Sequence, residues 1–363
     1  TLRSRGLGDV YKRQMSDKED IRQLTLEELT EKLVALGEKP YRAKQIHEWL
    51  WKKRATSFND MTNLSLSLRE LINKHFIINA IKLSKAQKSD DRTIKNAFLL
   101  ADDAVIEGVL IPTKKRMTAC VSVQVGCSLD CAFCATGKLK RVRNLNPDEI
   151  YDQVVMISNQ AAEEYDIPLS NIVFMGMGEP LLNYKSLITS IEKITSKEGL
   201  GMSPKRITVS TAGIAKMIHK LADDEVRFNL ALSLHAANDE KRNKIMPINE
   251  TNNLDVLKKA MQYFALKTDS RPTLEYIVFK DFNDELEDAK ELVDFASNFP
   301  AKVNIIEYNP IDGGKYQQAD PKKVDAFADY LEKNKLIVNI RRSRGKDIDA
   351  ACGQLANKND LSS

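Results

Sequence analysis

One stretch, ACVSVQVGCSLDCAFCATG (residues 119–137), joins an apolar, β-rich run to three closely spaced cysteines. Cys127, Cys131 and Cys134 follow a C-x3-C-x2-C spacing, and Phe133 precedes the last of them. The whole chain has only five cysteines, so three within eight residues favour a shared role over chance. An odd, clustered set also differs from the even, dispersed cysteines of a secreted disulfide framework. The pattern predicts reduced thiols in a loop that follows a strand.

Downstream of this loop, apolar β-rich runs alternate with amphipathic helical patterns. The predicted strands are 119–125, 171–176, 206–211, 228–234, 274–279 and 302–308, with a candidate edge strand at 336–340. The helical patterns cover 147–164, 185–197, 254–266 and 285–298. This alternation predicts an α/β fold with a parallel sheet covered by helices. Six such units are too few for a closed eight-fold barrel, so we expect a partial (β/α)6 barrel.

The residues before the barrel are predicted to form two smaller units. Residues 15–90 are expected to be an N-terminal helical accessory domain, with a capping box at Thr25 and Glu28 and a second helix near 41–53. Residues 91–117 are expected to form a β-hairpin linker, because apolar residues alternate around an Asp-Asp turn.

Composition and charge describe an ordinary soluble globular protein, with 42% hydrophobic and 29% charged residues. No run approaches the roughly 18 apolar residues of a membrane span, and no secretory signal is present, so a cytoplasmic location is expected. The basic, aperiodic residues 1–14 are interpreted as a non-native leader, and 357–363 as a flexible tail. Without the leader the formal charge of +4 falls to about +1, which says little about nucleic acid.

Polar or glycine-containing segments follow five of the predicted strands. They are GCSLDCAFC, GMGEP, STAG, SLHA and EYNP. The carboxyl ends of parallel strands meet at one edge of a sheet, and chemistry gathers there. The sequence therefore predicts a site at this edge.

The three-cysteine loop has the chemistry of a metal centre. Thiolates are soft ligands suited to zinc and to iron–sulfur clusters. Structural zinc takes four ligands, and the four histidines show no zinc-finger spacing. A C-x-x-C redox pair would leave Cys127 unexplained. A [4Fe-4S] cluster with one iron left open for another ligand fits the loop better.

The aromatic residue before the last cysteine makes the loop resemble the radical S-adenosylmethionine (SAM) superfamily. Together with FMGMGEPLLN, TVSTAGI, ALSLHAAND and SRGKDIDAACGQL, it resembles the RlmN/Cfr family of RNA adenine methyltransferases, the RlmN branch above all. The similarity covers nearly all of 15–356, with 118–356 as the radical SAM core. It implies a [4Fe-4S] cluster held by Cys127, Cys131 and Cys134, and SAM as the second cofactor.

The resemblance also implies an activity and partners. The activity is methylation, with two SAM per turnover, of C2 of an adenine in the peptidyl-transferase region of 23S rRNA and of the adenine beside the anticodon in tRNA. The implied partners are 23S rRNA, tRNA and an electron donor such as flavodoxin, with no membrane partner and a monomeric chain. The alternatives are Cfr-like methylation at C8, a radical SAM enzyme with another substrate, and a zinc-dependent RNA-binding module.

Three further residues acquire roles only through the resemblance. Cys352 would carry the methyl group as S-methylcysteine, lose a hydrogen from it to a 5′-deoxyadenosyl radical and bond to the base. Cys120 would then attack the Cys352 sulfur and release the product as a disulfide forms. Glu107 would accept the proton from the target carbon. From the residues alone, both cysteines are ordinary buried hydrophobes and Glu107 is a solvated hairpin residue.

The remaining expectations concern SAM and RNA. The resemblance assigns SAM contacts to Gly178, Glu179, Ser210, Ser233, Leu234, His235 and Asn309. Glycine allows close backbone approach, and a glutamate can bind the SAM ammonium. Three basic runs, 114–116, 138–143 and 341–346, lie within about ten residues of a functional cysteine and are expected to contact RNA phosphates.

Overall fold

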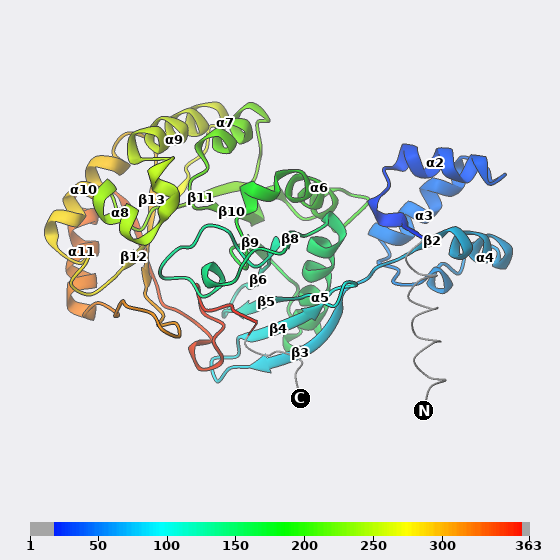
Figure 1. Ribbon diagram of the computed structural model, residues 1–363, viewed down its shortest axis with the longest axis horizontal. Coiled ribbons are helices and arrows are strands. Elements are labelled where there is room, and N and C mark those ends of the chain that lie inside the picture. Colours follow the sequence, from blue (N-terminus) through cyan, green and yellow to red (C-terminus); the bar gives the residue numbers. More distant parts are fainter. Residues whose placement is uncertain (1–17, 358–363) are drawn as a thin grey trace.

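The computed structural model describes residues 18–357 and is built around a curved ten-stranded sheet (Figure 1). Seven strands are parallel and lie in the sheet in chain order. They are β6 (Met117–Cys120), β9 (Asn171–Phe174), β10 (Ile207–Thr211), β11 (Asn229–Ser233), β12 (Thr273–Val278), β13 (Lys302–Glu307) and β14 (Ile337–Arg341). All predicted strands after the cysteine loop are present, and the run 336–340 is confirmed as the edge strand.

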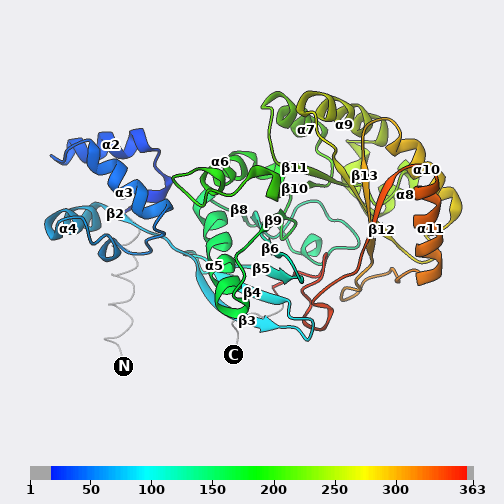
Figure 2. The ribbon, with the colours of Figure 1, turned by 180° about the vertical axis from the view of Figure 1, so that it is seen from behind.

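Helices connect consecutive parallel strands and cover the outer face of the sheet (Figures 1 and 2). They are α5 (Pro147–Tyr165), α6 (Tyr184–Thr195), α7 (Ala215–Asp223), α9 (Leu254–Thr268), α10 (Leu286–Ala296) and α11 (Pro321–Lys333). A short helix, α8 (Asp239–Ile245), precedes α9. Six strand–helix units followed by β14 confirm the partial (β/α)6 barrel. The sequence had not indicated α7, α8 or α11.

The first predicted strand, 119–125, is divided in the structure. β6 ends at Cys120, and β7 (Gln124–Val125) pairs instead with β8 (Arg143–Asn144) in a separate antiparallel sheet. The chain leaves the main ladder because the Val123 N–H donates to the Met177 carbonyl, beyond the end of β9. The short β7–β8 sheet then closes the base of the cysteine loop.

Three antiparallel strands extend the sheet beyond β6. They are β3 (Lys82–Lys88), β4 (Ile94–Leu99) and β5 (Val105–Pro112). The predicted hairpin is confirmed as β4–β5. The expectation of helix up to residue 90 is wrong over β3, which forms the outer edge. Its mostly exposed, lysine-rich side chains are typical of an edge strand, where charge discourages further pairing.

The N-terminal helices form a unit beside α5 and α6 (Figures 1 and 2). They are α2 (Leu26–Ala35), α3 (Tyr41–Trp51) and α4 (Leu66–His75), with β1 (Glu19–Asp20) and β2 (Phe76–Ile77) paired in parallel. Both hydrogen bonds of the predicted capping box are present between Thr25 and Glu28. The buried Arg22 guanidinium joins the unit to α5, at 3.0 Å from Asp148 and 2.8 Å from Asp152.

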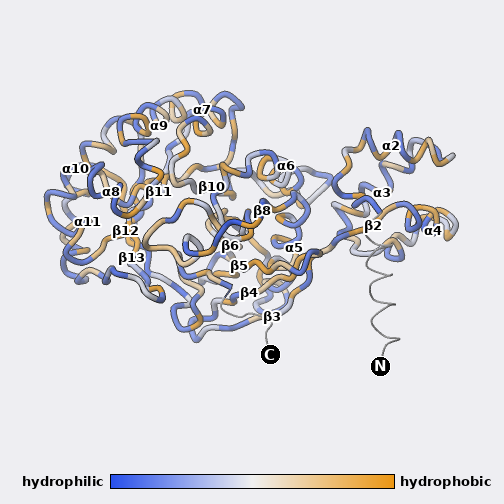
Figure 3. The backbone as a smooth tube through the Cα atoms, viewed as in Figure 1, coloured by the Kyte–Doolittle hydropathy of each residue, from blue (hydrophilic) through white to orange (hydrophobic). Residues whose placement is uncertain are grey.

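Hydrophobic segments lie mainly along the sheet, and hydrophilic ones on the outer turns (Figure 3). None of the helices within 18–357 is long and apolar enough to cross a membrane. The predicted leader, 1–14, lies outside the described residues, as do 358–363 of the predicted tail. Asn357, the first tail residue, is held in place: its N–H donates to Glu107 at 3.2 Å, and its side-chain amide to the Val105 carbonyl at 2.8 Å.

Candidate active site

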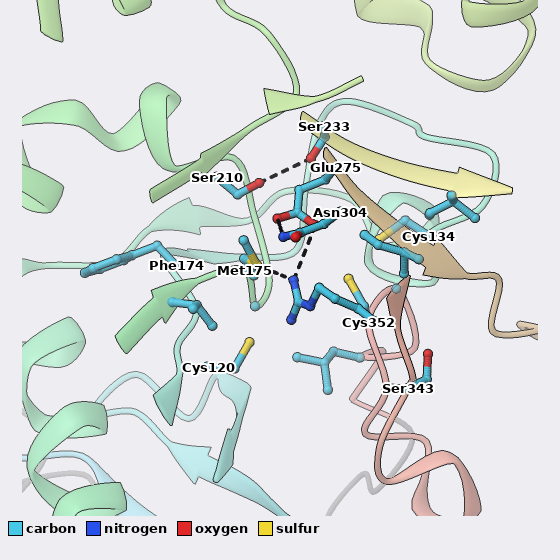
Figure 4. Close-up of a pocket in the computed structure, with 18 of the residues that line it drawn as sticks. Cys120, Cys134, Phe174, Met175, Ser210, Ser233, Glu275, Asn304, Ser343 and Cys352 are labelled. Carbon is cyan, nitrogen blue, oxygen red and sulfur yellow. Dashed lines mark hydrogen bonds and ion pairs between the residues drawn. The ribbon is translucent and has the colours of Figure 1, made fainter. Parts of the chain in front are cut away.

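A cavity of about 730 Å³ opens at the carboxyl ends of the parallel strands, and all five cysteines line it. Figure 4 shows three of them, Cys120, Cys134 and Cys352. Five of the seven predicted SAM contacts also line it, namely Gly178, Glu179, Ser210, Ser233 and His235. Leu234, Asn309 and Glu107 do not belong to its lining. The predicted edge of the sheet is therefore where the candidate residues meet.

The cysteine loop is closed by backbone contacts. β7 and β8 form its stem, and the Cys127 N–H donates to the Leu139 carbonyl at 3.2 Å. Gly126 has φ +75°, and a Cβ there would lie 2.3 Å from the Lys140 carbonyl oxygen. Only glycine tolerates both the left-handed backbone and this close approach. The loop thus needs glycine directly before its first cysteine.

Phe133 fixes the other end of the loop. Its ring is 8% exposed and packs edge-on against His235, with ring centroids 4.7 Å apart. Edge-to-face contacts of this kind stabilise aromatic pairs beyond simple burial. The aromatic residue of the cysteine motif therefore anchors the loop to the end of β11.

The C-terminal segment is hydrogen-bonded to the cysteine loop. The Ala135 N–H donates to the Gly353 carbonyl at 2.7 Å, and the Thr136 hydroxyl to the Leu355 carbonyl at 2.6 Å. The Asn309 side-chain amide donates to the Cys352 carbonyl at 3.2 Å. These bonds bring Cys352 beside a loop that lies more than two hundred residues earlier in the sequence.

Cys120 and Cys352 face the same space from β6 and from the C-terminal segment (Figure 4). All five cysteines are free thiols, so the disulfide implied by the resemblance is not formed in this structure. Burial raises the pKa of the Cys120 thiol to about 12. Desolvation by the surrounding protein raises the pKa of Cys352 to about 11, although this side chain is exposed to the cavity. The positive charge of Arg341 lowers the pKa of both thiols and so opposes the effect of burial.

Sequence reasoning missed the network that holds Arg341. Its Nη1 lies 3.3 Å from Oε2 of Glu275, which is 3% exposed, and 4.0 Å from the Met175 sulfur. The other Glu275 oxygen accepts a hydrogen bond from Asn304 at 2.8 Å (Figure 4). A carboxylate inside the apolar strand β12 was the available signal, because buried charges are normally paired.

Glu179 is the buried carboxylate of the GMGEP segment, at 3% exposure. Its Oε1 accepts the Leu181 N–H at 3.0 Å, and its Oε2 accepts the Ala212 N–H at 2.7 Å. Burial raises the pKa of this carboxyl against the effect of these bonds. Gly178, with φ +95°, has no room for a Cβ beside Gln124. The segment thus presents a fixed carboxylate to the cavity.

His235 is a neutral, strained residue. Its backbone has φ +56°, which is uncommon outside glycine, and its Nδ1 accepts the Ile277 N–H at 3.1 Å. Burial lowers its pKa to about 3, with a further contribution from Arg242. A neutral ring whose Nδ1 accepts a bond carries its proton on Nε2, which suits contact with a ligand.

Glu107 lies on β5, is 1% exposed and is 3.5 Å from the Lys95 ammonium. Its Oε2 accepts the N–H groups of Ala356 and Asn357 at 2.9 and 3.2 Å. In this arrangement the carboxylate anchors the segment that follows Cys352.

Much of the predicted RNA-binding charge is used internally. Arg143 binds both Asp102 and Glu149, while Arg342 and Lys346 share Glu307. The run 114–116 is exposed at the turn between β5 and β6, and Arg116 and Arg344 line the cavity. These residues remain candidates for phosphate contact.

The three loop cysteines fit an iron–sulfur cluster. Burial is the largest cause of the raised pKa of Cys131, and negative charge on Cys134 or Cys127 raises that pKa further. The three thiols are therefore close to one another. Within 18–357, no three His, Cys, Asp or Glu side chains converge to hold a single metal ion. A cluster has no such requirement, because its thiolates bind different irons around a larger volume.

The comparisons with known proteins agree with this geometry. Residues 121–296 match the radical SAM superfamily, and residues 19–78 match the ribosomal RNA large subunit methyltransferase N-terminal domain. The barrel and its cysteine loop therefore define a radical SAM enzyme, a class that uses a [4Fe-4S] cluster and SAM.

Whole-chain relatives define the family. A probable dual-specificity RNA methyltransferase RlmN from Christiangramia forsetii is 60% identical and aligns over 94% of this chain and 97% of its own length. The Bacillus licheniformis relative of the same name is 42% identical over 96% of each chain. The crystal structure of a radical SAM methyltransferase from Sphaerobacter thermophilus has a TM-score of 0.87 and 36% identity, covering 93% of this chain and 99% of that one. The chain belongs to the RlmN family of radical SAM RNA methyltransferases.

Proposed function

We propose that this RNA methyltransferase methylates C2 of adenine, in the peptidyl-transferase region of 23S rRNA and beside the anticodon in tRNA, through S-methylcysteine at Cys352. The observation that supports this most is that Cys120 and Cys352 line the same cavity as the three cluster cysteines. A radical SAM enzyme acting on a small molecule needs no second pair of cysteines there.

The target carbon explains why a cysteine would carry the methyl group. A ring carbon between two nitrogens is electron-poor and does not attack the methyl group of SAM. When bound, the cluster and SAM supply one-electron chemistry at carbon. Cys352 takes a methyl group from one SAM, and a second SAM is used in the radical step. The hydrogen bonds from Ala135 and Thr136 support this assignment, because they keep the Cys352 segment beside the cysteine loop.

Cys120 would release the product. Its thiolate attacks the Cys352 sulfur, an S–S bond forms, and the bond between that sulfur and the methylene carbon breaks. The electron pair of the broken bond goes to the methylene carbon, which takes up a proton and becomes the methyl group. An external dithiol supplies the two electrons that reduce the resulting disulfide before the next turnover, which restores the two free thiols seen in this structure.

The role of Glu107 as proton acceptor remains a prediction. Its buried carboxylate binds the backbone after Cys352 and would have to reach the base from there. The proposal has three further parts. The basic run 114–116 contacts RNA phosphates, a donor such as flavodoxin supplies the electron, and the enzyme acts as a monomer.

The test is nucleoside mass spectrometry of rRNA and tRNA from a deletion strain complemented with this chain. The expected product is 2-methyladenosine in both RNAs. Cys352→Ala should abolish it, whereas Cys120→Ala should accumulate a covalent RNA–protein adduct that is visible on denaturing gels. The matched control is the double variant, which should form no adduct because the adduct requires Cys352.

Other outcomes would contradict the proposal in defined ways. If the product were 8-methyladenosine, the enzyme would have the Cfr-like activity, methylation at C8, in place of methylation at C2. Normal turnover by Cys120→Ala would remove its resolving role, and methylation by Cys352→Ala would remove the S-methylcysteine route.

A further inference from the structure

Arg242, on α8, is a buried cation that the proposed reaction does not use. It is 0% exposed, and its hydrogen bonds all go to neutral acceptors. These are the carbonyls of Leu234 at 3.1 Å, Ala212 at 2.6 Å and Ser233 at 3.2 Å, and the side-chain oxygen of Asn249 at 2.7 Å. The guanidinium is therefore held rigidly between the ends of β10 and β11.

No ion pair in the described part of the chain includes Arg242. Arg22, the other buried arginine of residues 18–357, contrasts with it, because two carboxylates lie within 3.0 Å of Arg22. The negative charge of Asp239 acts on Arg242, but Asp239 is exposed and forms no ion pair with it, and its Oδ1 accepts the Asn249 side-chain amide at 2.7 Å. A buried charge without a counter-charge is costly, so the surroundings of Arg242 call for a negative group.

The cysteine loop is the place where such a group would lie. The Ala132 N–H donates to the Ile245 carbonyl at 2.9 Å, so the end of α8 is bonded to the residue after Cys131. Arg242 does not line the cavity, so its influence on the site passes through the loop and not through direct contact with substrate.

A cluster bound by three thiolates carries a net negative charge, and one-electron reduction makes that charge larger. A fixed positive charge nearby stabilises the reduced form more than the oxidised form. Because Arg242 is fully buried, neither water nor salt screens this interaction strongly.

The geometry points to Arg242 as a positioning residue that offsets the charge of the thiolate-bound cluster and raises its reduction potential. This inference rests on the cluster and is independent of which RNA carbon is methylated. In this role, α8 makes the one-electron reduction of the cluster more favourable.

The test is an electron-paramagnetic-resonance redox titration of the reconstituted protein, without SAM or RNA. In Arg242→Gln, the ratio of reduced to oxidised cluster at a fixed potential should fall about tenfold, which is about 59 mV for one electron. Lys244→Gln, on the same helix, is the matched control. Its ammonium is exposed and paired with Glu240 at 3.0 Å, so the potential should stay unchanged. Arg242→Lys, which keeps the charge, should retain a potential close to that of the wild type.

The inference is overturned if Arg242→Gln binds about four irons and titrates like the wild type. If Arg242→Gln does not fold, Arg242→Lys decides. If Arg242→Lys is less stable than the wild type but its cluster has an unchanged reduction potential, the role of charge is supported. If its reduction potential falls together with its stability, Arg242 serves only to hold the strand ends. Because no RNA is present, failure here leaves the proposed methylation chemistry untouched.

Discussion

The glycine before the first cluster cysteine allows a quantitative test of how the loop is closed. In Gly126→Ala, the new Cβ would lie 2.3 Å from the Lys140 carbonyl oxygen, so the backbone on one side of the loop must move. That movement disrupts the Cys127–Leu139 and Val142–Val125 hydrogen bonds, of 3.2 and 2.8 Å.

The expected cost has two parts. A non-glycine residue with left-handed backbone costs roughly 1–2 kcal/mol. Two weakened hydrogen bonds cost roughly 0.5–1.5 kcal/mol each. The free energy of unfolding of the apo protein should therefore fall by about 2–5 kcal/mol, and the variant should retain less iron after reconstitution.

Gly201→Ala is the matched control. Gly201 also has positive φ, at +65°, but a Cβ there would meet nothing within 4 Å. Its variant should lose only the backbone contribution, roughly 1–2 kcal/mol, and bind iron normally. Urea titrations and iron analysis compare the two proteins. Equal stability and equal iron content would refute the argument that close approach to Lys140 requires glycine at 126.

Three further predictions concern charge. Arg22→Met leaves Asp148 buried without its cation and should lower the free energy of unfolding by about 3–5 kcal/mol in urea titrations. His235 has a pKa lowered to about 3, so the folded state resists its protonation and stability is lost as the pH falls below the ordinary value of 6.5. This loss should be about 2 kcal/mol between about pH 7 and pH 5, and His235→Asn should lack it. Arg341→Met removes the charge that lowers the pKa of Cys352, so alkylation of Cys352 by iodoacetamide near pH 8 should slow by a few-fold to about tenfold.

Each of these has a control on the same part of the molecule. Arg54→Met, in the same N-terminal unit as Arg22, removes an exposed guanidinium and should change stability little. An unchanged acid slope in His235→Asn would assign the pH dependence to other groups. Arg342→Met is compared with Arg341→Met, because Arg342 pairs with Glu307; equal slowing by both would contradict a specific effect of Arg341.

The barrel and the position of the cluster loop could be predicted from the sequence. Apolar runs such as 228–234 and 302–308 alternate with helical patterns, and the carboxyl ends of parallel strands must share an edge. This rule is enough to predict that Cys127, Ser233 and Glu179 lie at one site. The lysine-rich strand β3 was missed, because its mostly exposed side chains lack the apolar alternation of a half-buried strand.

The parts that could not be predicted depend on contacts between distant segments. Nothing near Cys352 in the sequence indicates that Gly353 bonds to Ala135, so its place in the cavity required the fold or a family resemblance. Arg242 and Arg341 are ordinary basic residues in their local sequence. Only the packed structure shows that the first is buried without an ion pair among the described residues and that the second joins Glu275 in the cavity wall.

The bonds between the C-terminal segment and the cysteine loop have a consequence for synthesis of the chain. The cluster ligands and every strand of the barrel precede Gly345, so the part that handles electrons is made before the residue proposed to carry the methyl group. A chain that ends before Cys352 would keep the three cysteines of the loop and lose the residue proposed to accept the methyl group. Such a shortened protein could generate a radical but would lack the methylated cysteine from which that radical is proposed to remove a hydrogen. On the proposed mechanism, synthesis of the segment that contains Cys352 is therefore what makes a radical-generating enzyme a methyltransferase.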